Sequence, residues 1–299
     1  MRYQFPRCRL ARAGTPFFPG VLAYTATAPW QYGTEGAVPT VNIVVCVKQV
    51  PETSAKKEIT ADFRLNRPEL EAVINPFDEY AIEESLRLKE QHGGEVTVLT
   101  MGPESAEDTI RKALAMGADT GVLVTDPALE GTDAWGTAYV LGQALQRLRY
   151  DIVMTGMEST EARTGLVPAA LAQQVALPAL TYAQAVSLQD GKVRINRQIP
   201  GGYQEVEADL PVLISVVKGV NEPRYPSLKG IMAARRKEVR RFSLADLQIE
   251  PPSVGATGAR EQVVAATPRA ERTAGEKISG TPEEIAIRIA DFLADQKFI

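Results

Sequence analysis

From residue 41 onward, short apolar runs rich in β-branched residues alternate with stretches of helical character, and this alternation constrains the fold more than any other feature. Five of the runs are predicted to be strands, at residues 42–50, 95–102, 120–126, 150–156 and 211–217. Each run is mostly apolar without strict alternation, as expected when both faces of a strand are buried. The pattern predicts a doubly wound α/β domain with a mostly parallel sheet.

Helices are expected between these strands. Asn75 can cap the first of them, with Pro76 in its first turn. The other helices are predicted at residues 103–117, 132–148 and 164–175. The only histidine, His92, is followed by two glycines, which indicates the carboxyl end of a helix rather than a catalytic base.

Residues 185–210 interrupt the alternation of strands and helices. Asp190-Gly191 is a strong hairpin turn signal, and Gly201-Gly202 offers a second turn. We therefore expect an antiparallel excursion at one edge of the sheet.

The composition changes after Leu247, where Pro, Gly, Ala and Thr become frequent and apolar periodicity is lost. Helical spacing returns near the end of the chain, where Thr281 and Glu284 form a predicted capping box around Pro282. These features predict a domain at 41–247 and an extended arm at 248–299 that ends in a helix. Periodicity leaves open whether this helix docks on the same chain or on another.

The first 40 residues have a different character. They contain four Arg and no acidic residue before Glu35, with an Ala-Thr-Ala triplet at 26–28 that faintly resembles a signal peptide. Pro16 and Pro19 interrupt its apolar stretch. The alternative, which we favour, is an upstream extension from a misplaced start codon, with the natural chain beginning near Val41. The mass of the N-terminal peptide of the native protein distinguishes the two.

Composition excludes several classes of function. Two cysteines, Cys8 and Cys46, cannot build a disulfide framework, and no Cys/His cluster has the spacing of a zinc or iron–sulfur site. A reducing, cytoplasmic setting and no bound metal are expected. No apolar run is long enough to span a bilayer, so the chain is not expected to be integral to a membrane.

One segment is strongly basic although the whole chain has a net charge of -4. Residues 218–241 contain eight Lys or Arg against two Glu, a net charge of +6. Such a run can bind nucleic acid, form a solvated face, or steer an acidic protein partner. Charge alone favours the solvated face.

Neither G-x-G-x-x-G nor G-x-x-x-x-G-K-[ST] occurs, so the usual nucleotide fingerprints are missing. In open α/β sheets, however, ligands bind beyond the carboxyl ends of the strands. Gly156 ends one predicted strand and is followed by Ser159, Thr160 and Thr164, and then Gly165 opens a helix. Hydroxyls before a helix are more often caps than ligands, but together these residues predict an anion site.

Several segments resemble the characteristic stretches of electron transfer flavoprotein β subunits. In chain order they are NIVVCVKQVPET, INPFDEYAIEESLRLKE, TIRKALAMGAD, GMESTEARTGLVPA, VNEPRYPSLKGIMAARRK and PRAERTAG. The resemblance covers about 41–299, and its most specific parts are RKALAMGAD and RYPSLKGIM.

The resemblance implies a Rossmann-like sheet of the adenine nucleotide alpha hydrolase type, and a heterodimer with an α subunit that carries most of the FAD site. The arm at 248–299, with its helix, is expected to pack on that α subunit. It implies an electron carrier without catalytic residues of its own, accepting electrons from primary dehydrogenases such as acyl-CoA dehydrogenases and passing them to a quinone oxidoreductase. The β chain would bind AMP, or a second FAD in a bifurcating member that uses NADH. From another class, a stand-alone nucleotide-binding regulator remains an alternative.

By the same resemblance, the adenine nucleotide contacts fall in the first predicted strand, at the start of the first predicted helix, at the end of the second predicted strand and in the loop that ends the fourth. They are Cys46, Asn75, Pro76, Phe77, Asp78, Met101, Gly156, Met157, Glu158, Ser159, Thr160, Arg163, Thr164 and Gly165. The loop is shorter here than in many relatives and lacks their Gln, which leaves the individual roles of its residues open. Arg163 would suit a phosphate charge.

The segment 221–237 resembles the partner-docking loop of the family, with Leu228 as the apolar anchor on a dehydrogenase. The other docking residues implied are Tyr225, Ile231, Met232, Arg235, Arg236 and Lys237. Leu228 could instead fold back on its own helix, as loop leucines commonly do. A protein partner rather than nucleic acid is the expected ligand of the basic run.

Overall fold

The computed structural model describes residues 40–54, 58–61, 63–67, 70–266 and 275–299. The extension expected at 1–40 therefore falls, apart from its last residue, outside the described residues. The chain divides into two compact units, Met1–Gln262 and Val263–Ile299, which are treated separately below. No helix in the described part of the chain is both long and apolar enough to cross a membrane.

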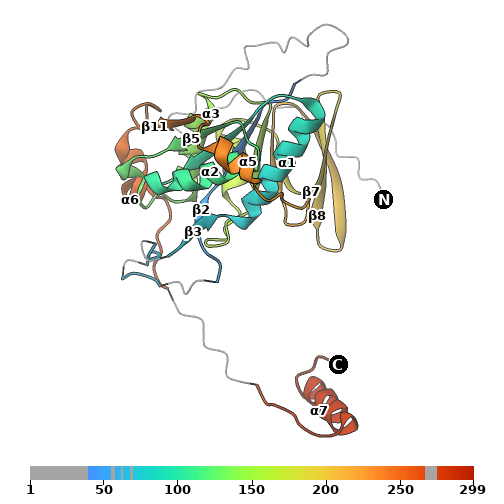
Figure 1. Cartoon of the computed structure of the whole chain (residues 1–299). Helices are drawn as coiled ribbons and strands as arrows, with labels where there is room; N and C mark the ends of the chain where they lie inside the picture. The colour runs from blue at the N-terminus through green and yellow to red at the C-terminus, as the bar shows by residue number, and fades with distance from the viewer. Residues whose placement is uncertain (1–39, 55–57, 62, 68–69, 267–274) are drawn as a thin grey trace, which may run out of the picture. The chain divides into compact units, whose positions relative to one another are not determined.

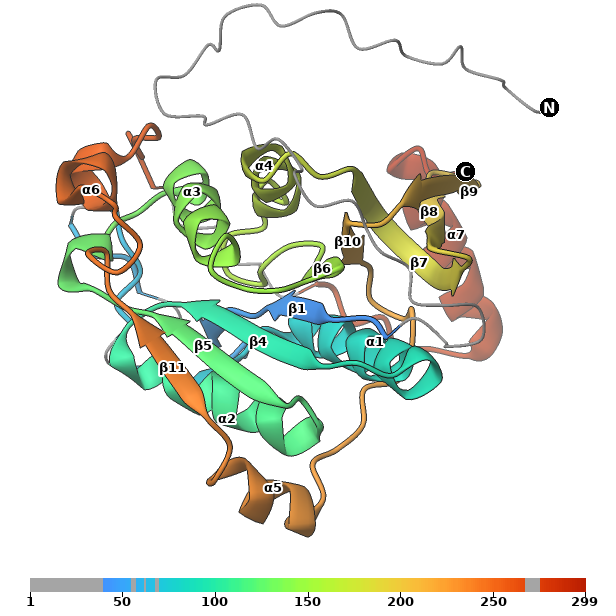
Figure 2. The same ribbon diagram turned by 90° about the horizontal axis from the view of Figure 1, so that it is seen from above.

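The first unit is built on a mixed sheet (Figure 1). Its nine described strands lie in the order β11-β5-β4-β1-β6-β10-β7-β8-β9 (Figure 2). Neighbours from β11 to β7 are parallel, and the last two pairs are antiparallel. In chain order the strands are β1 (Ile43–Cys46), β4 (Val96–Met101), β5 (Thr120–Val124), β6 (Ile152–Gly156), β7 (Ala179–Gln189), β8 (Lys192–Ile199), β9 (Gly202–Asp209), β10 (Val212–Val216) and β11 (Val239–Phe242). The predicted doubly wound, mostly parallel sheet is confirmed.

Helices cover both faces of this sheet (Figure 2). One face carries α1 (Pro76–His92) and α2 (Glu107–Met116), and the other carries α3 (Ala134–Leu145) and α4 (Val167–Gln174). The shorter helical elements are η1 (Glu104–Ala106), η2 (Pro127–Leu129), α5 (Leu228–Ala234), η3 (Pro251–Ser253) and α6 (Gly255–Gly258). Of these, α5 packs against α2.

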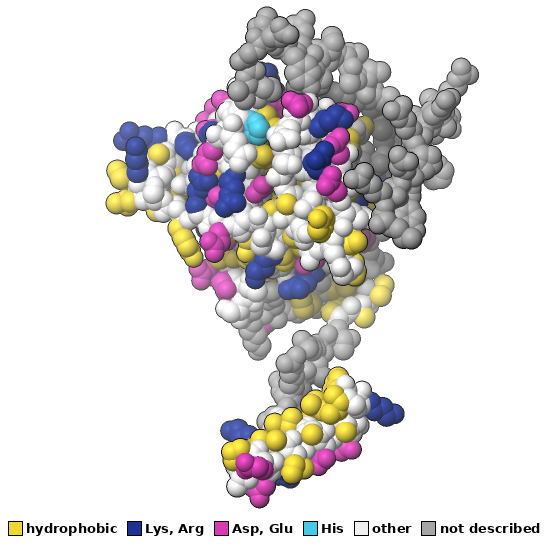
Figure 3. Space-filling model, turned by 90° about the vertical axis from the view of Figure 1, so that its right-hand side faces the viewer, with side chains coloured by type: hydrophobic (Ala, Val, Ile, Leu, Met, Phe, Trp, Pro, Cys, Tyr) yellow, Lys and Arg dark blue, Asp and Glu magenta, His cyan; other side chains and the backbone are white. Residues whose placement is uncertain are grey.

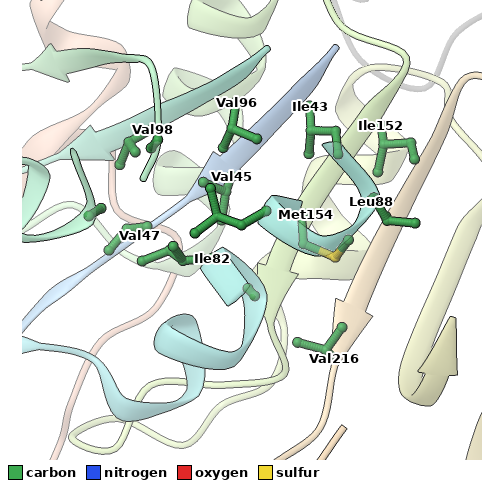
Figure 4. Close-up of a cluster of buried hydrophobic side chains, with 14 of the residues drawn as sticks. Ile43, Val45, Val47, Ile82, Leu88, Val96, Val98, Ile152, Met154 and Val216 are labelled. Atoms are coloured by element: carbon green, nitrogen blue, oxygen red, sulfur yellow. The ribbon is translucent and has the colours of Figure 1, made fainter. Parts of the chain in front are cut away.

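The core follows from the sequence of the central strand β1. Ile43 and Val45 belong to the hydrophobic cluster under α1 and α2, whereas Val44 and Cys46 belong to the cluster under α3 and α4. Figure 4 shows Val45 beside Ile82 of α1, which is fully buried. Burying each such side chain contributes about 1.5–3 kcal/mol. Because successive side chains of a strand point to opposite faces, an apolar run without alternation requires helices on both faces.

Two strand features were not expected. The first predicted strand stops at Cys46, and β2 (Gln49–Pro51) pairs instead with β3 (Ala72–Ile74) in an antiparallel ribbon. The edge strand β11 pairs in parallel with β5. Its sequence, VRRF, is half-charged because an edge strand is only partly covered, so it lacks the apolar run that reveals a buried strand.

The antiparallel excursion is confirmed but begins earlier than residue 185. β7 starts at Ala179, pairs first in parallel with β10 and then antiparallel with β8. Asp190 and Gly191 both have positive φ, 51° and 74°, as the predicted two-residue hairpin turn requires.

The boundary of the C-terminal arm differs from the prediction at residue 248. Residues up to Gln262 belong to the first unit, because Ile249 and Val254 are buried in its core. The amide of Gly255 also donates to Thr132 Oγ1 at 2.9 Å. Two isolated apolar residues and backbone hydrogen bonds hold this Pro-rich segment, and neither produces a periodicity in the sequence.

The second unit contains the predicted capped helix, α7 (Pro282–Asp295). Both halves of the capping box between Thr281 and Glu284 are present, and Pro282 opens the helix. Apolar side chains, including Ile287 and Phe292, lie exposed along it, and Figure 3 shows them as a yellow stripe. That this face docks on another subunit stays a prediction.

Candidate functional site

A cavity of about 880 Å³ lies at the carboxyl ends of β1, β4 and β6. The chain runs outward from β1 through β4 and β5 on one side and through β6 and β10 on the other. The switch point of the sheet is therefore between β1 and β6. Ligands of open α/β sheets bind in the crevice at this place.

Nine of the fourteen predicted nucleotide-contact residues line this cavity. They are Cys46, Asn75, Asp78, Met101, Gly156, Glu158, Ser159, Thr164 and Gly165. Pro76 and Phe77 form the first turn of α1, and Met157 and Thr160 stay half-buried in the loop without lining the cavity. Arg163 is exposed and also lies outside the lining, so its place gives no support to the phosphate role expected of it.

Asp78, in the first turn of α1, is the most perturbed carboxyl of the cavity. Burial raises its pKa to about 7, although hydrogen bonds from the Lys48 amide, the Asn75 side chain and the Gly156 amide act to lower it. The Lys48 amide donates to Asp78 Oδ2 at 2.8 Å. The carboxyl therefore takes up a proton at a higher pH than an exposed aspartate does.

Gly156 is required where β6 meets the start of α1. A Cβ at this position would lie 2.4 Å from Asp78 Oδ1 and 2.8 Å from the backbone carbonyl carbon of Phe77. Cys46, on the neighbouring strand, is also buried, and burial together with the charge of Asp78 raises the pKa of its thiol to about 12. The thiol is therefore protonated and acts as part of an apolar wall.

Asn75 shapes the loop 157–165 rather than capping its helix. It occupies the position before α1, but its side chain makes no capping hydrogen bond. Its Nδ2 donates to the carbonyl of Glu158 at 2.9 Å, and its Oδ1 accepts from the amide of Thr160 at 3.2 Å. The amide thus clamps the loop to the start of α1 and fixes that wall of the cavity.

Sequence reasoning missed a charged cluster beside the same loop. The carboxylate of Glu161 has an exposed fraction of only 5% and pairs with Lys48 and with Arg67, the latter at 2.7 Å. Burial would raise the pKa of Glu161, yet the two cations hold it below its usual value. Lys48 and Arg67 also line the cavity and supply its positive charge. Of these three residues, only Lys48, two residues after β1, lies near the carboxyl end of a parallel strand, where the sequence alone suggests a ligand site.

The amino ends of α3 and α4 also face the cavity, through Asp133 and Val167 among others. Asp133 caps α3 by accepting from the Gly136 amide at 2.7 Å, and its carboxylate makes that end unsuitable for an anion. By contrast, α4 has no side-chain cap and carries a proline in its first turn. Pro168 has no amide hydrogen, so the other amides of this turn, beside Thr164 and Gly165, are the donors suited to a phosphate.

The docking segment, 221–237, forms a separate surface that contains α5. Tyr225, Leu228 and Met232 are 95%, 77% and 63% exposed. Ile231 is 44% exposed and borders a groove between α5 and α2, and Arg235 and Arg236 are exposed at the end of α5. Leu228 therefore does not fold back on its own helix. The docking segment exposes an apolar anchor beside the positive charges of Arg235 and Arg236.

The base of the docking segment is tied to α1. Arg224 donates to Glu83 twice, from Nε to Oε2 at 2.7 Å and from Nη2 to Oε1 at 3.0 Å, and it also pairs with Glu90. Asn221 Nδ2 donates to Glu84 Oε2 at 2.9 Å. Burial alone would raise the pKa of Glu83, but hydrogen bonds from Arg224 and Arg87 lower it. The segment is anchored through buried carboxylates.

Lys237 differs from its expected role as a free steering charge. Its ammonium donates to the backbone carbonyls of Leu114, at 3.2 Å, and of Ala118. Burial lowers its pKa. The side chain therefore points at the end of α2 and not toward a partner.

Fold and cavity together place the chain among doubly wound α/β proteins with a cavity at the switch point of the sheet. Residues 62–247 match the family model described as the electron transfer flavoprotein domain. The chain belongs to the electron transfer flavoprotein family, among its β subunits.

Three relatives illustrate the similarity. The electron transfer flavoprotein subunit beta of Mycobacterium tuberculosis is 42% identical over 265 residues, covering 86% of this chain and 99% of the relative. The protein of the same description from Thermoanaerobacterium thermosaccharolyticum is 38% identical over 260 residues, covering 86% of this chain and 100% of the relative. The caffeyl-CoA reductase-Etf complex subunit CarD of Acetobacterium woodii is 33% identical over 260 residues, covering 86% and 99%.

Proposed function

We propose that this chain pairs with an electron transfer flavoprotein α subunit, which holds most of the FAD, and that the heterodimer carries electrons from primary dehydrogenases to a quinone-reducing acceptor. Acyl-CoA dehydrogenases are the expected donors. The flavin supplies the redox chemistry when bound, while this chain forms one wall of the flavin cleft and docks the donor. The observation that carries the docking role is the exposed Leu228, on a helix that stands apart from the cavity.

We further propose that the cavity at the switch point binds AMP. The volume of about 880 Å³ lies within the usual range of small-molecule sites. The uncapped end of α4 offers amides to a phosphate, and Lys48, which is paired with Glu161, lies in the cavity wall as a cation. Gly156 leaves the strand end open beside Asp78. The nucleotide would have a structural role, because AMP carries no redox-active group.

The volume of the cavity also keeps a second FAD as the alternative occupant, since it lies in the upper part of the range for ligand sites. Under that alternative the complex would be a bifurcating flavoprotein that accepts electrons from NADH. The nucleotide extracted from the native complex separates the two proposals.

The docking role predicts that Leu228→Ala slows electron transfer from a reduced acyl-CoA dehydrogenase without changing flavin content. A buried anchor at the centre of an interface contributes about 2 kcal/mol or more, so kcat/KM for the dehydrogenase should fall at least about 30-fold. Stopped-flow reduction of the flavin measures this. The matched control is Tyr203→Ala, which removes another exposed apolar side chain, on the far edge strand β9. Equal rates in both variants would remove Leu228 from the docking site.

A further inference from the structure

The docking helix α5 has only seven residues, Leu228–Ala234. Helices this short are unstable in water unless tertiary contacts hold them. At its amino end Ser227 accepts a hydrogen bond from the Gly230 amide at 3.0 Å. This cap fixes one turn of the helix but does not fix its direction relative to the rest of the protein.

The carboxyl end of α5 is capped by a side chain from α2. Arg111 Nη1 donates to the carbonyls of Ala234 and Lys237, both at 2.8 Å. Arg111 is itself oriented by Glu107, whose Oε1 accepts from Nη2 at 2.7 Å. The last carbonyls of a helix have no partner within the helix, so this arginine satisfies groups that would otherwise face solvent.

The relationship is reciprocal, because Lys237 caps the carboxyl end of α2. Its ammonium donates to the carbonyls of Leu114 and Ala118, as a cation does favourably at the negative end of a helix. The two helices also approach closely. A Cβ at Gly230 would lie 2.3 Å from the carbonyl oxygen of Ala115, so only glycine permits this contact.

We propose that Lys237, Arg111 and Gly230 are positioning residues that fix α5 on α2 and thereby present Leu228 in a preorganised orientation. The inference rests on the docking role proposed above. An anchor held in its bound orientation loses less conformational entropy on association than an anchor on a loose segment. The three residues therefore act through geometry and not by contact with the dehydrogenase.

The first test compares Lys237→Met with Arg240→Met in the assembled complex. Both variants remove one positive charge from the same basic run, but Arg240 is an exposed residue of the edge strand β11 and caps neither α2 nor α5 in the described structure. We expect Lys237→Met to raise the KM for the dehydrogenase about tenfold with kcat unchanged. Hydrogen exchange at the amides of α5 should become about tenfold faster in this variant, and neither the KM nor the exchange rate should change in Arg240→Met.

The second variant, Gly230→Ala, leaves every charge in place and improves intrinsic helix propensity by about 1 kcal/mol. Weaker docking in this variant would therefore come from displacement of α5 off α2. Equal KM values for Lys237→Met and Arg240→Met would overturn the inference, as would unchanged hydrogen exchange in α5. If α5 exchange rises but Leu228→Ala has no effect on transfer, the docking role fails while the anchoring of α5 stands.

Discussion

A Gly156→Ala variant is expected to lose its nucleotide and about 2–3 kcal/mol of unfolding free energy. The new Cβ would lie 2.4 Å from Asp78 Oδ1 and 2.8 Å from the carbonyl carbon of Phe77. The second atom belongs to the backbone, so the start of α1 must move away from β6. Overpacking of a closed site has this cost, and the displaced segment forms one wall of the cavity. The measurements are the nucleotide retained after purification and the midpoint of urea unfolding.

Gly202→Ala is the matched control for this variant. Gly202 opens β9, its added Cβ would meet no atom within 4 Å, and its φ is outside the range that disfavours side chains. This variant should retain full nucleotide and stay within about 0.5 kcal/mol of the parent. A Gly156→Ala protein with parental stability and full nucleotide would contradict the proposed site.

An Arg224→Ala variant is expected to be destabilised by about 3 kcal/mol and to release the docking segment from α1. The carboxylate of Glu83 is only 4% exposed, and the substitution removes the guanidinium that donates two hydrogen bonds to it. Breaking a buried pair from one side costs about 3–5 kcal/mol, and the remaining bond from Arg87, 3.0 Å from Glu83 Oε1, favours the lower value. Urea unfolding measures the loss, and limited proteolysis near residue 224 reports the released segment.

Arg236→Ala is the control for a lost positive charge, because Arg236 is exposed. It should change stability by less than about 0.5 kcal/mol. Combining Arg224→Ala with Glu83→Gln should recover part of the loss, since the buried charge is removed as well. Equal stability of Arg224→Ala and Arg236→Ala would show that the ion pair does not anchor the segment.

The sheet could be predicted from sequence because its strands are buried on both faces. An uninterrupted apolar run such as that at Ile152–Gly156 is typical of a central strand between two layers of helices. The place of the ligand cavity followed as well, since the carboxyl ends of parallel strands meet at one edge. Helix α7 was predicted because its capping box is a local pattern.

The features that sequence did not reveal depend on contacts between distant residues. Glu161 and Arg67 are 94 positions apart, and Arg111 and Lys237 are 126 apart. No local pattern shows that Lys237 caps α2, since a lysine beside two arginines is typical of a solvated basic face. The ion pairs of Glu161 form because Lys48, after β1, and Arg67, before β3, both lie beside the loop after β6.

The composition of the native complex tests the central claim most directly. Intact mass and nucleotide extraction should be carried out on the complex purified from its own cells without added cofactors. We predict one copy of this chain and one α subunit, with one FAD and one AMP per heterodimer. Two FAD and no AMP would replace the AMP proposal with the bifurcating alternative, and a homo-oligomer without flavin would contradict the role of electron carrier.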